Sequence, residues 1–340
     1  MTQQEQHNSQ DSQHDATVHV PFYVEGTMEK LISLSKRRGF IYQGSEIYGG
    51  LAGTWDYGPL GVSLKNNIKQ IWWKQFVHDR EDMYGIDAAI LMNQHVWKAS
   101  GHVDGFSDPL VEDLETKKRY RADHLLEDYV EKTGDTSADP KGKSISEMDA
   151  LIKEKNIKSP DGNKLGDVRQ FNMMLSTKVG AIQDDSSISY LRPETAQGMF
   201  VNFKNVVDSF HPKLPFGLAQ IGKAFRNEIA PRDFIFRTRE FEQMEIEYFI
   251  KPPKDEHDTA WVALFDHFRE EVKKFTTSIG LTPSKVHELE IAPEDRAHYS
   301  KRTIDFEFDY PFGRKELYGL AYRTDHDLKS HTAGSGVDLT

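Results

Sequence analysis

Two runs of alternating residues flank a loop rich in arginine and proline between residues 217 and 249. Side chains alternate across a strand, so this pattern predicts a long antiparallel hairpin. In the first run, one face would carry Leu218, Gln220, Gly222, Ala224, Arg226 and Glu228. In the second run, one face would carry Phe241, Gln243, Glu245 and Glu247, and the other Met244, Ile246, Tyr248 and Ile250. One apolar and one polar face indicate a sheet that packs on a core on one side and holds a site on the other.

The composition limits the classes of protein to which the chain can belong. At 340 residues it exceeds what one hydrophobic core usually serves, so we expect one large domain with an insertion or a second domain. The net charge of −11 argues against a protein that binds nucleic acid over its whole surface. The sequence has no cysteine, which excludes disulfides and thiolate metal sites, and its 14 histidines show no metal-ligand spacing. No signal-peptide pattern and no apolar run of roughly 20 residues is visible, so a cytoplasmic protein without membrane contact is expected.

The chain divides into four segments by composition. Residues 1–24 form a polar tail that we predict to be disordered, and residues 25–103 begin the main domain. Residues 104–168 are rich in charge, Gly, Pro and Ser and are interpreted as an insertion, with helical stretches near 122–132 and 144–155. Residues 169–340 complete the main domain. Apolar periodicity in these main-domain segments predicts helices after Thr27, over 64–76, over 192–207 and over 261–275, and strands over 304–309 and 314–321.

The hairpin motif resembles a known family. Its F-R-N-E sequence at 225–228, the Pro-Arg loop and the F-R-T-R-E-F-E-Q-M-E sequence at 236–245 resemble motif 2 of class II aminoacyl-tRNA synthetases, in detail those of the homodimeric glycyl type. The helix over 64–76, with Pro59 at its entrance, resembles motif 1, although an ordinary core helix would show the same periodicity. The resemblance covers about residues 25–330. It implies an α+β fold, the class II catalytic domain, with an antiparallel sheet of six or seven strands flanked by helices and an α+β insertion.

The resemblance implies ATP-dependent activation of glycine to glycyl-adenylate and its transfer to tRNA(Gly). The carboxylate that attacks ATP is already ionised at neutral pH, so the site must supply alignment and positive charge rather than a general base. Arg226 suits this task, because its planar fork can hold a phosphate oxygen and the substrate carboxylate together. By resemblance, Glu228 would accept from the adenine amino group and Phe241 would stack on the adenine ring. The alternatives are an ion pair between Arg226 and Glu228, and a packing role for Phe241.

Further site residues follow from the resemblance. The expected ATP-binding residues are Arg226, Asn227, Glu228, Phe236, Arg237, Thr238, Arg239, Glu240, Phe241, Glu316 and Leu317. Glu316 would also hold Mg²⁺, because a cation that bridges phosphates needs few protein carboxylates; an exposed strand residue is the alternative. The expected substrate-binding residues are Arg121, Glu194, Phe241, Glu242, Gln243, Met244 and Glu245.

Glycine offers no side chain to recognise, so selection must rest on its ammonium and carboxylate groups and on exclusion of anything larger. Glu194, Gln243 and Glu245 are the candidates for the ammonium, with Glu194 expected in the first turn of a helix, where acidic residues are also common for stability alone. Arg121 is expected to reach the substrate from the insertion. Excluding alanine would be a steric matter.

The sequence is compatible with several related functions. A threonyl or prolyl synthetase shares the motif 2 framework, although the expected zinc ligands of a threonine site are not found, and residues 111–116 lack the C-x-x-C that many relatives carry. No motif 3 arginine or anticodon-binding domain follows Arg323, so we expect a truncated chain with weakened ATP binding. The alternative function is a non-catalytic dimerising or nucleotide-binding fragment. A homodimer through residues 55–85 is expected, because Trp72, Trp73 and Phe76 give that helix a surplus of aromatic surface.

Overall fold

The computed structural model describes residues 27–181, 184, 187–255, 257–297 and 299–339; the predicted disordered tail at 1–24 lies outside this range. The helices are α1 (Thr27–Arg37), α2 (Pro59–Trp73), α3 (Gln94–Ala99), α4 (His102–Gly105), α5 (Ala122–Thr133), α6 (Ile145–Glu154), α7 (Ala196–Phe210), α8 (Ala260–Ser278) and α9 (His326–Ser335). The first strands are β1 (Ile41–Gln43), β2 (Trp55–Tyr57), β3 (Met83–Gly85), β4 (Leu91–Met92), β5 (Ser107–Glu112), β6 (Arg119–Arg121) and β7 (Arg169–Asn172). The later strands are β8 (Ser176–Lys178), β9 (Ile188–Leu191), β10 (Phe216–Phe225), β11 (Glu240–Phe249), β12 (Val286–Glu290), β13 (Arg302–Tyr310) and β14 (Gly313–Tyr322).

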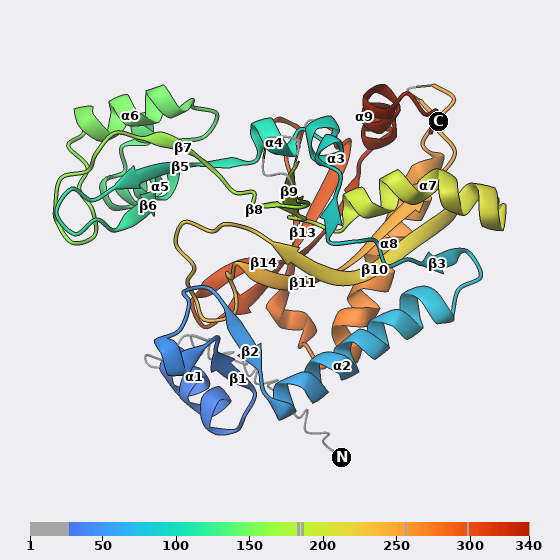
Figure 1. The fold of residues 1–340 in the computed structure, drawn as a ribbon, viewed down its shortest axis with the longest axis horizontal. Coiled ribbons are helices and arrows are strands. Elements are labelled where there is room, and N and C mark those ends of the chain that lie inside the picture. Colours follow the sequence, from blue (N-terminus) through green and yellow to red (C-terminus); the bar gives the residue numbers. More distant parts are fainter. Residues whose placement is uncertain (1–26, 182–183, 185–186, 256, 298, 340) are drawn as a thin grey trace, which may run out of the picture.

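The long antiparallel hairpin forms as predicted. β10 and β11 pair antiparallel over ten positions, with Gln220 opposite Glu245 and Ala224 opposite Phe241. β3 adds to β10 in parallel. Figure 1 shows α2 and α7 on opposite sides of this sheet. Met244, Ile246 and Tyr248 pack with α2 and α8, which confirms the apolar face expected from the alternation.

Outside the insertion, the described strands form four separate sheets, where the resemblance led us to expect one of six or seven strands. The first has the order β11-β10-β3 and the second β12-β13-β14; the others are β4-β9-β8 and the pair β1-β2. No backbone hydrogen bonds join β11 to β14 among the described residues, and residues of both strands line one cavity. The second sheet packs on α8 through Phe265, Ile304 and Phe306. The expectation of a single sheet was therefore wrong for this part of the fold.

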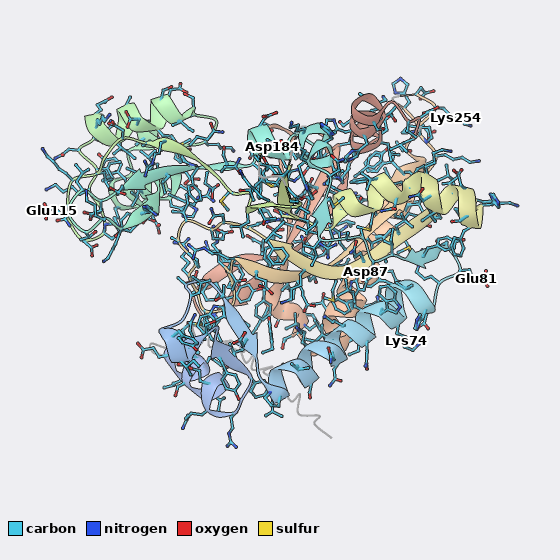
Figure 2. The ribbon with its side chains drawn as sticks, viewed as in Figure 1. Lys74, Glu81, Asp87, Glu115, Asp184 and Lys254 are labelled. Atoms are coloured by element: carbon cyan, nitrogen blue, oxygen red, sulfur yellow. The ribbon has the colours of Figure 1, made fainter. Side chains whose placement is uncertain are left out.

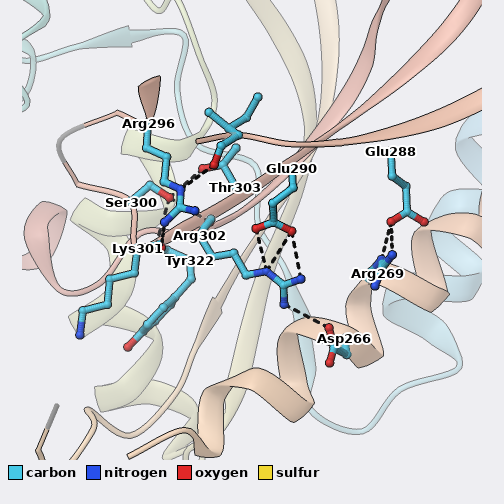
Figure 3. Close-up of polar contacts among 11 residues, drawn as sticks. Asp266, Arg269, Glu288, Glu290, Arg296, Ser300, Lys301, Arg302, Thr303 and Tyr322 are labelled. Carbon is cyan, nitrogen blue, oxygen red and sulfur yellow. Dashed lines mark hydrogen bonds and ion pairs between the residues drawn. The ribbon is translucent and has the colours of Figure 1, made fainter. Parts of the chain in front are cut away.

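Ion pairs also attach α8 to the second sheet (Figure 3). Arg302 on β13 donates from Nε to Glu290 at 3.0 Å and from Nη1 to Asp266 of α8 at 3.2 Å. Arg269 of α8 pairs with Glu288 of β12. These groups are partly exposed, so each pair contributes about 0.2–1 kcal/mol at most. The buried aromatic contacts beneath them dominate the packing.

α2 begins at Pro59, as expected, but its aromatic residues are not a surface surplus. Trp72 is 5% exposed and Phe76, in the π-helical turn that continues α2, is 2% exposed. Phe76 packs against Trp72 and against Phe275 of α8, with ring centroids 5.5 and 5.9 Å apart. Figure 2 shows Lys74 on the outer side of this segment, where it pairs with Asp79. The prediction that Trp72 and Phe76 lie in a subunit interface was wrong. Apolar periodicity shows that a helix face is buried but not which element covers it.

Residues between β5 and β7 form a small unit with its own core, set apart at one end of the molecule (Figure 1). The two helical stretches predicted in this region are α5 and α6. They pack on a sheet of order β6-β5-β7, and β7 lies just after residue 168. In the stretch at 111–116, buried Asp113 accepts from Ser159 Oγ at 2.6 Å and from the Glu115 and Thr116 amides at 2.9 Å. Burial would raise the pKa of Asp113, but these hydrogen bonds outweigh it and hold the pKa well below its usual value. The carboxylate thus ties two loops of the unit together.

No helix within the described ranges has the length and apolar character needed to cross a membrane.

Candidate active site

A cavity of about 1910 Å³ lies between the hairpin, α7, α8 and the second sheet. Its lining includes Arg226 and Phe241 at the loop end of the hairpin, and Glu194, Gln243, Glu245 and Glu247 farther along. Glu316 and Arg323 line it from β14 and the turn after β14. The polar face predicted for the hairpin therefore faces a cavity.

Arg226 follows the end of β10 and extends the ladder through its amide, which donates to the Arg239 carbonyl at 2.9 Å. Its guanidinium carbon lies 5.2 Å from the ring centroid of Phe241 and 5.5 Å from that of Phe106, at cation–π distance. Nε donates to the Pro193 carbonyl at 3.1 Å. Among the described residues, the two Nη groups make no hydrogen bond. This arrangement holds the arginine in place and leaves the end of its fork for an anionic ligand.

Carboxylates gather at the other end of the polar face. Glu194 precedes α7, and Glu245 and Glu247 project from β11. Gln243 accepts from the Thr195 amide at 3.1 Å, and Thr195 Oγ1 donates to Glu245. Burial, and then the negative charge of Glu194, raise the pKa of Glu245 to about 7. Burial raises the pKa of Glu247 well above its usual value. The raised pKa values show that the positive charge near this cluster does not balance its carboxylates.

We expected Glu194 in the first turn of a helix, and this was wrong. α7 begins two residues later, at Ala196, with Thr195 as its N-cap. Neighbouring side chains, rather than the N-terminal turn of a helix, therefore stabilise its ionised carboxylate. Gln197 donates to Oε1 at 2.9 Å, and Nε2 of His102 lies 3.4 Å from Oε2. Burial would raise the pKa of Glu194, but these two contacts outweigh it and lower the pKa to about 2. Glu194 is therefore the ionised member of the cluster at neutral pH.

One cation faces the carboxylates from the turn after β14. Arg323 donates from Nε and Nη2 to the two oxygens of Asp327, each at 3.0 Å. Its guanidinium carbon lies 4.1 Å from the ring centroid of Tyr299. Burial alone would lower the pKa of Arg323, but the nearby Glu247 and Asp327 raise it above its usual value. Arg323 thus remains charged and offsets part of the acidic cluster.

Comparisons with known proteins agree with this geometry. Residues 178–323 match the model of the tRNA synthetase class II core domain (G, H, P, S and T). The chain is 51% identical over 318 residues to the glycine–tRNA ligase of Alkaliphilus oremlandii, covering 93% of this chain and 67% of that protein. It is 52% identical to the corresponding ligase of Clostridium tetani, covering 93% and 68%. The chain belongs to the glycine–tRNA ligase family. It is thus an aminoacyl-tRNA synthetase of class II, a family of enzymes that join glycine to tRNA, and the threonyl and prolyl alternatives fall away.

Solved structures share the fold of this glycine–tRNA ligase family member at low identity. Prolyl-tRNA synthetase from Giardia lamblia, in complex with prolyl-adenylate, superposes with a TM-score of 0.56 at 12% identity. It covers 89% of this chain and 45% of the other. Prolyl-tRNA synthetase from Cryptosporidium parvum, complexed with halofuginone and AMPPNP, gives a TM-score of 0.55 at 12% identity, covering 88% and 44%. These matches bear on the fold alone and agree with the class II catalytic domain. The chain spans about two thirds of the curated ligases it matches, 67% and 68%, and less than half of these structures.

Nine of the residues predicted for the ligase site line the cavity. They are Glu194, Arg226, Phe241, Glu242, Gln243, Met244, Glu245, Glu316 and Leu317. Two of these, Glu242 and Met244, lie with Glu240 on the face of β11 opposite the polar face. Glu242 pairs with Lys65 and Lys69 of α2, Met244 packs in the core beside Trp72, and Glu240 pairs with Lys223. Strand alternation thus directs the side chains of Glu240, Glu242 and Met244 toward α2 and solvent.

The remaining predicted residues lie around the hairpin loop and the insertion. Arg237 Nη1 lies 3.7 Å from buried Glu228, whose pKa is raised by burial. Arg121 donates to Asp108 at 2.8 Å and to Asp123, so its fork is already engaged within the insertion. Other neighbours of the loop are placed by packing and backbone contacts. Phe236 packs on Tyr310 and Phe312, the Asn227 amide donates to Met173, Thr238 Oγ1 donates to the Glu240 carbonyl, and Arg239 donates to the Ala52 and Glu228 carbonyls.

The sequence reasoning missed three residues at the acidic end of the cavity. Thr195 contacts Gln243 and Glu245, His102 contacts Glu194, and Arg323 faces Glu247. His102 and Arg323 come from segments far from the hairpin in the sequence. A usable signal was the cluster of charged residues in Arg323-Thr324-Asp325-His326-Asp327, directly after an alternating strand. Polar residues at the end of a strand that faces a site are candidates for that site.

Proposed function

We propose that the cavity holds glycine and ATP side by side and joins them into glycyl-adenylate, which then passes glycine to tRNA(Gly). The observation that carries this proposal is the polarity of one strand face. Carboxylates of Glu194 and Glu245 lie at one end of the cavity, and Arg226 stacked on Phe241 lies at the other. A glycine ammonium suits the first end, and a carboxylate beside a phosphate suits the second. The proposal also places the protein in the cytoplasm.

The proposed chemistry asks for alignment and charge rather than proton transfer. An oxygen of the glycine carboxylate would attack the α-phosphorus of ATP, and pyrophosphate would leave. The free Nη groups of Arg226 would contact the α-phosphate, where negative charge increases in the transition state. Phe241, already in contact with the Arg226 guanidinium, would offer a ring surface for the adenine. Restricting the two substrates to one cavity supplies the alignment.

Mg²⁺ belongs to this proposal as a partner of the ATP phosphates. Glu316 and Asp305 both line the cavity, and an oxygen of each would lie 3.5 Å from a β-carbon at Gly319, so the two carboxylates converge. Burial, and then its proximity to Asp305, raise the pKa of Glu316. The described residues hold no group of three or more potential metal ligands. A pair of carboxylates completed by phosphate oxygens and water fits Mg²⁺, which would neutralise phosphate charge when bound.

Replacing Glu194 tests the ammonium end of the cavity. We expect Glu194→Gln to raise the KM for glycine by about 10–150-fold, the equivalent of a charge-assisted hydrogen bond of about 1.5–3 kcal/mol. The KM for ATP should change much less. The measurement is glycine-dependent exchange of pyrophosphate into ATP. Glu290→Gln, a surface residue paired with Arg302, is the matched control. An unchanged glycine KM in Glu194→Gln would exclude this end of the cavity as the glycine site.

The raised pKa of Glu245 predicts a pH dependence of glycine binding. A bound ammonium stabilises the ionised carboxylate, so binding lowers a pKa that is about 7 in the free protein and releases a proton. The affinity for glycine should therefore rise as the pH increases from 6 to 8. Calorimetric titration at these two pH values measures the change. In Glu245→Gln the dependence should flatten, and an equally steep profile in this variant would refute the assignment.

We extend the proposal to a homodimer that uses the N-terminal part of the main domain. Large apolar side chains are exposed on β1, β2, the turn between them and the start of α2. They include Ile47 (89% exposed), Tyr48 (87%), Leu51 (58%), Leu60 (48%) and Leu64 (52%). Such a concentration of apolar surface is typical of an interface, and a second copy of the chain offers the same surface.

The dimer is tested by placing charge on this surface. We expect the double variant Ile47→Asp, Leu51→Asp to sediment as a monomer at micromolar concentration, with an unchanged circular dichroism spectrum, because two carboxylates cannot be desolvated there without partners. Leu289→Asp, a similarly exposed leucine on β12, is the control and should leave the mass unaltered. A wild-type chain that sediments as a monomer would contradict the proposal.

A further inference from the structure

A buried glutamine connects the carboxylates of Glu194 and Asp327 at the acidic end of the cavity. Gln197, the second residue of α7, is 1% exposed. Its Nε2 donates to Glu194 Oε1 at 2.9 Å and to Asp327 Oδ1 at 3.2 Å. Its Oε1 lies 2.7 Å from Nε2 of His331, a residue of α9 that is 4% exposed. Since both amide hydrogens are engaged, Oε1 must be the acceptor and His331 must donate.

This orientation of the amide is fixed by its surroundings. A flipped amide would place two oxygen acceptors against its own oxygen and leave the His331 donor against N–H groups. Leaving such buried groups unsatisfied is costly. Gln197 can therefore hold Glu194 in one orientation only. His102 contacts the other carboxylate oxygen at 3.4 Å, so both oxygens of Glu194 have a neighbour.

The same glutamine reaches the cation of the site. Asp327 shares its Oδ1 between Gln197 and Arg323 Nη2, and its Oδ2 accepts from Arg323 Nε. Asp327 is itself buried. A continuous set of hydrogen bonds therefore runs from Glu194 through Gln197 and Asp327 to Arg323. α9 supplies Asp327 to this set and also carries His331, which donates to Gln197.

We infer that Gln197 is a positioning residue, which aims the Glu194 carboxylate at the substrate ammonium and fixes Arg323 relative to it. This inference rests on the proposed glycine site. Gln197 acts through Glu194 and Asp327 rather than by touching the substrate. Through His331, α9 takes part in ordering the ammonium pocket, although its residues lie about 130 positions from Glu194 in the sequence. Loss of the glutamine should weaken recognition of the ammonium group and leave recognition of the nucleotide intact.

Two ligands separate these effects. One is a non-hydrolysable glycyl-sulfamoyl adenosine, and the other carries an acetyl group in place of glycyl and so lacks the ammonium. We expect Gln197→Met to weaken binding of the glycyl compound by about tenfold or more, since the Glu194 carboxylate loses its donor. Binding of the acetyl compound should stay close to the wild-type value. Gln75→Met is a matched control, because Gln75 also donates from Nε2 to two acceptors, both on Glu271 of α8 and away from the cavity.

The outcomes separate the inference from the proposal beneath it. An equal loss for both ligands, or no loss for either, would overturn the positioning role. If the wild type and Glu194→Gln bind the two compounds with the same ratio of affinities, the proposed glycine site itself fails. Should Gln197→Met not fold, His331→Phe removes the anchoring donor and should show the same selective loss. His331→Gln keeps a donor and should restore binding of the glycyl compound.

Discussion

Replacing Arg226 by alanine is expected to reduce the rate of adenylate formation by about 100–1000-fold. This is the usual effect of losing one group that stabilises transition-state charge. Arg226 is fixed by Pro193, Phe106 and Phe241, and its Nη groups make no hydrogen bond within the described part of the chain. Its loss should remove charge where the α-phosphate would lie and leave the sheet unaltered. The measurement is glycine-dependent pyrophosphate exchange on protein of wild-type thermal stability.

Two further variants define what the arginine contributes. Arg226→Lys keeps the charge but not the planar fork, so we expect it to recover only part of the lost activity. Arg269→Ala removes an arginine from a surface ion pair with Glu288 and should retain full activity (Figure 3). A folded Arg226→Ala variant with normal exchange would show that the phosphate binds elsewhere.

The largest expected effect on stability comes from Phe76. Truncation to alanine should lower the free energy of unfolding by about 3–5 kcal/mol, because a buried aromatic ring is removed from a core that cannot collapse fully around the space. The ring contacts Trp72 and Phe275, so its loss loosens the attachment of α2 to α8. Urea denaturation followed by tryptophan fluorescence measures the change.

The exposed residue Leu31 on α1 provides the comparison, and Leu31→Ala should cost under about 1 kcal/mol. The assembly state of Phe76→Ala, where it still folds, should match that of the wild type. A stability close to wild type together with a loss of dimer would restore Phe76 to the subunit interface and contradict its buried position.

The hairpin could be predicted because its information is local. Period-2 alternation fixes which side chains share a face, and the register that places Gln220 opposite Glu245 follows once the loop is recognised. The same rule places Glu242 and Met244 on the face opposite Gln243, since both alternate with it along the strand. Resemblance to a motif selected a continuous stretch, whereas a strand presents every second residue.

Long-range relations could not be read from the sequence. The contact between Gln197 and Asp327 joins residues 130 positions apart, and neither segment carries a sign of the other. The burial of Trp72 and Phe76 depends on α8, about 200 positions later, so an aromatic helix face had two possible partners. The division of the strands into separate sheets depends on which strand edges meet, and strand patterns alone do not specify this.

The two strand edges at the cavity predict a characteristic pattern of amide hydrogen exchange in the site. β11 bonds to β10 and β14 bonds to β13, each along one side only among the described residues. Alternate amides of these ten-residue strands therefore point away from any strand partner. Their hydrogens should exchange with deuterated solvent faster than those of the neighbouring amides in the same strand. The strand that presents Gln243 and Glu245 is thus protected on one side and open on the other, and a ligand that fills the cavity would slow exchange along its open side.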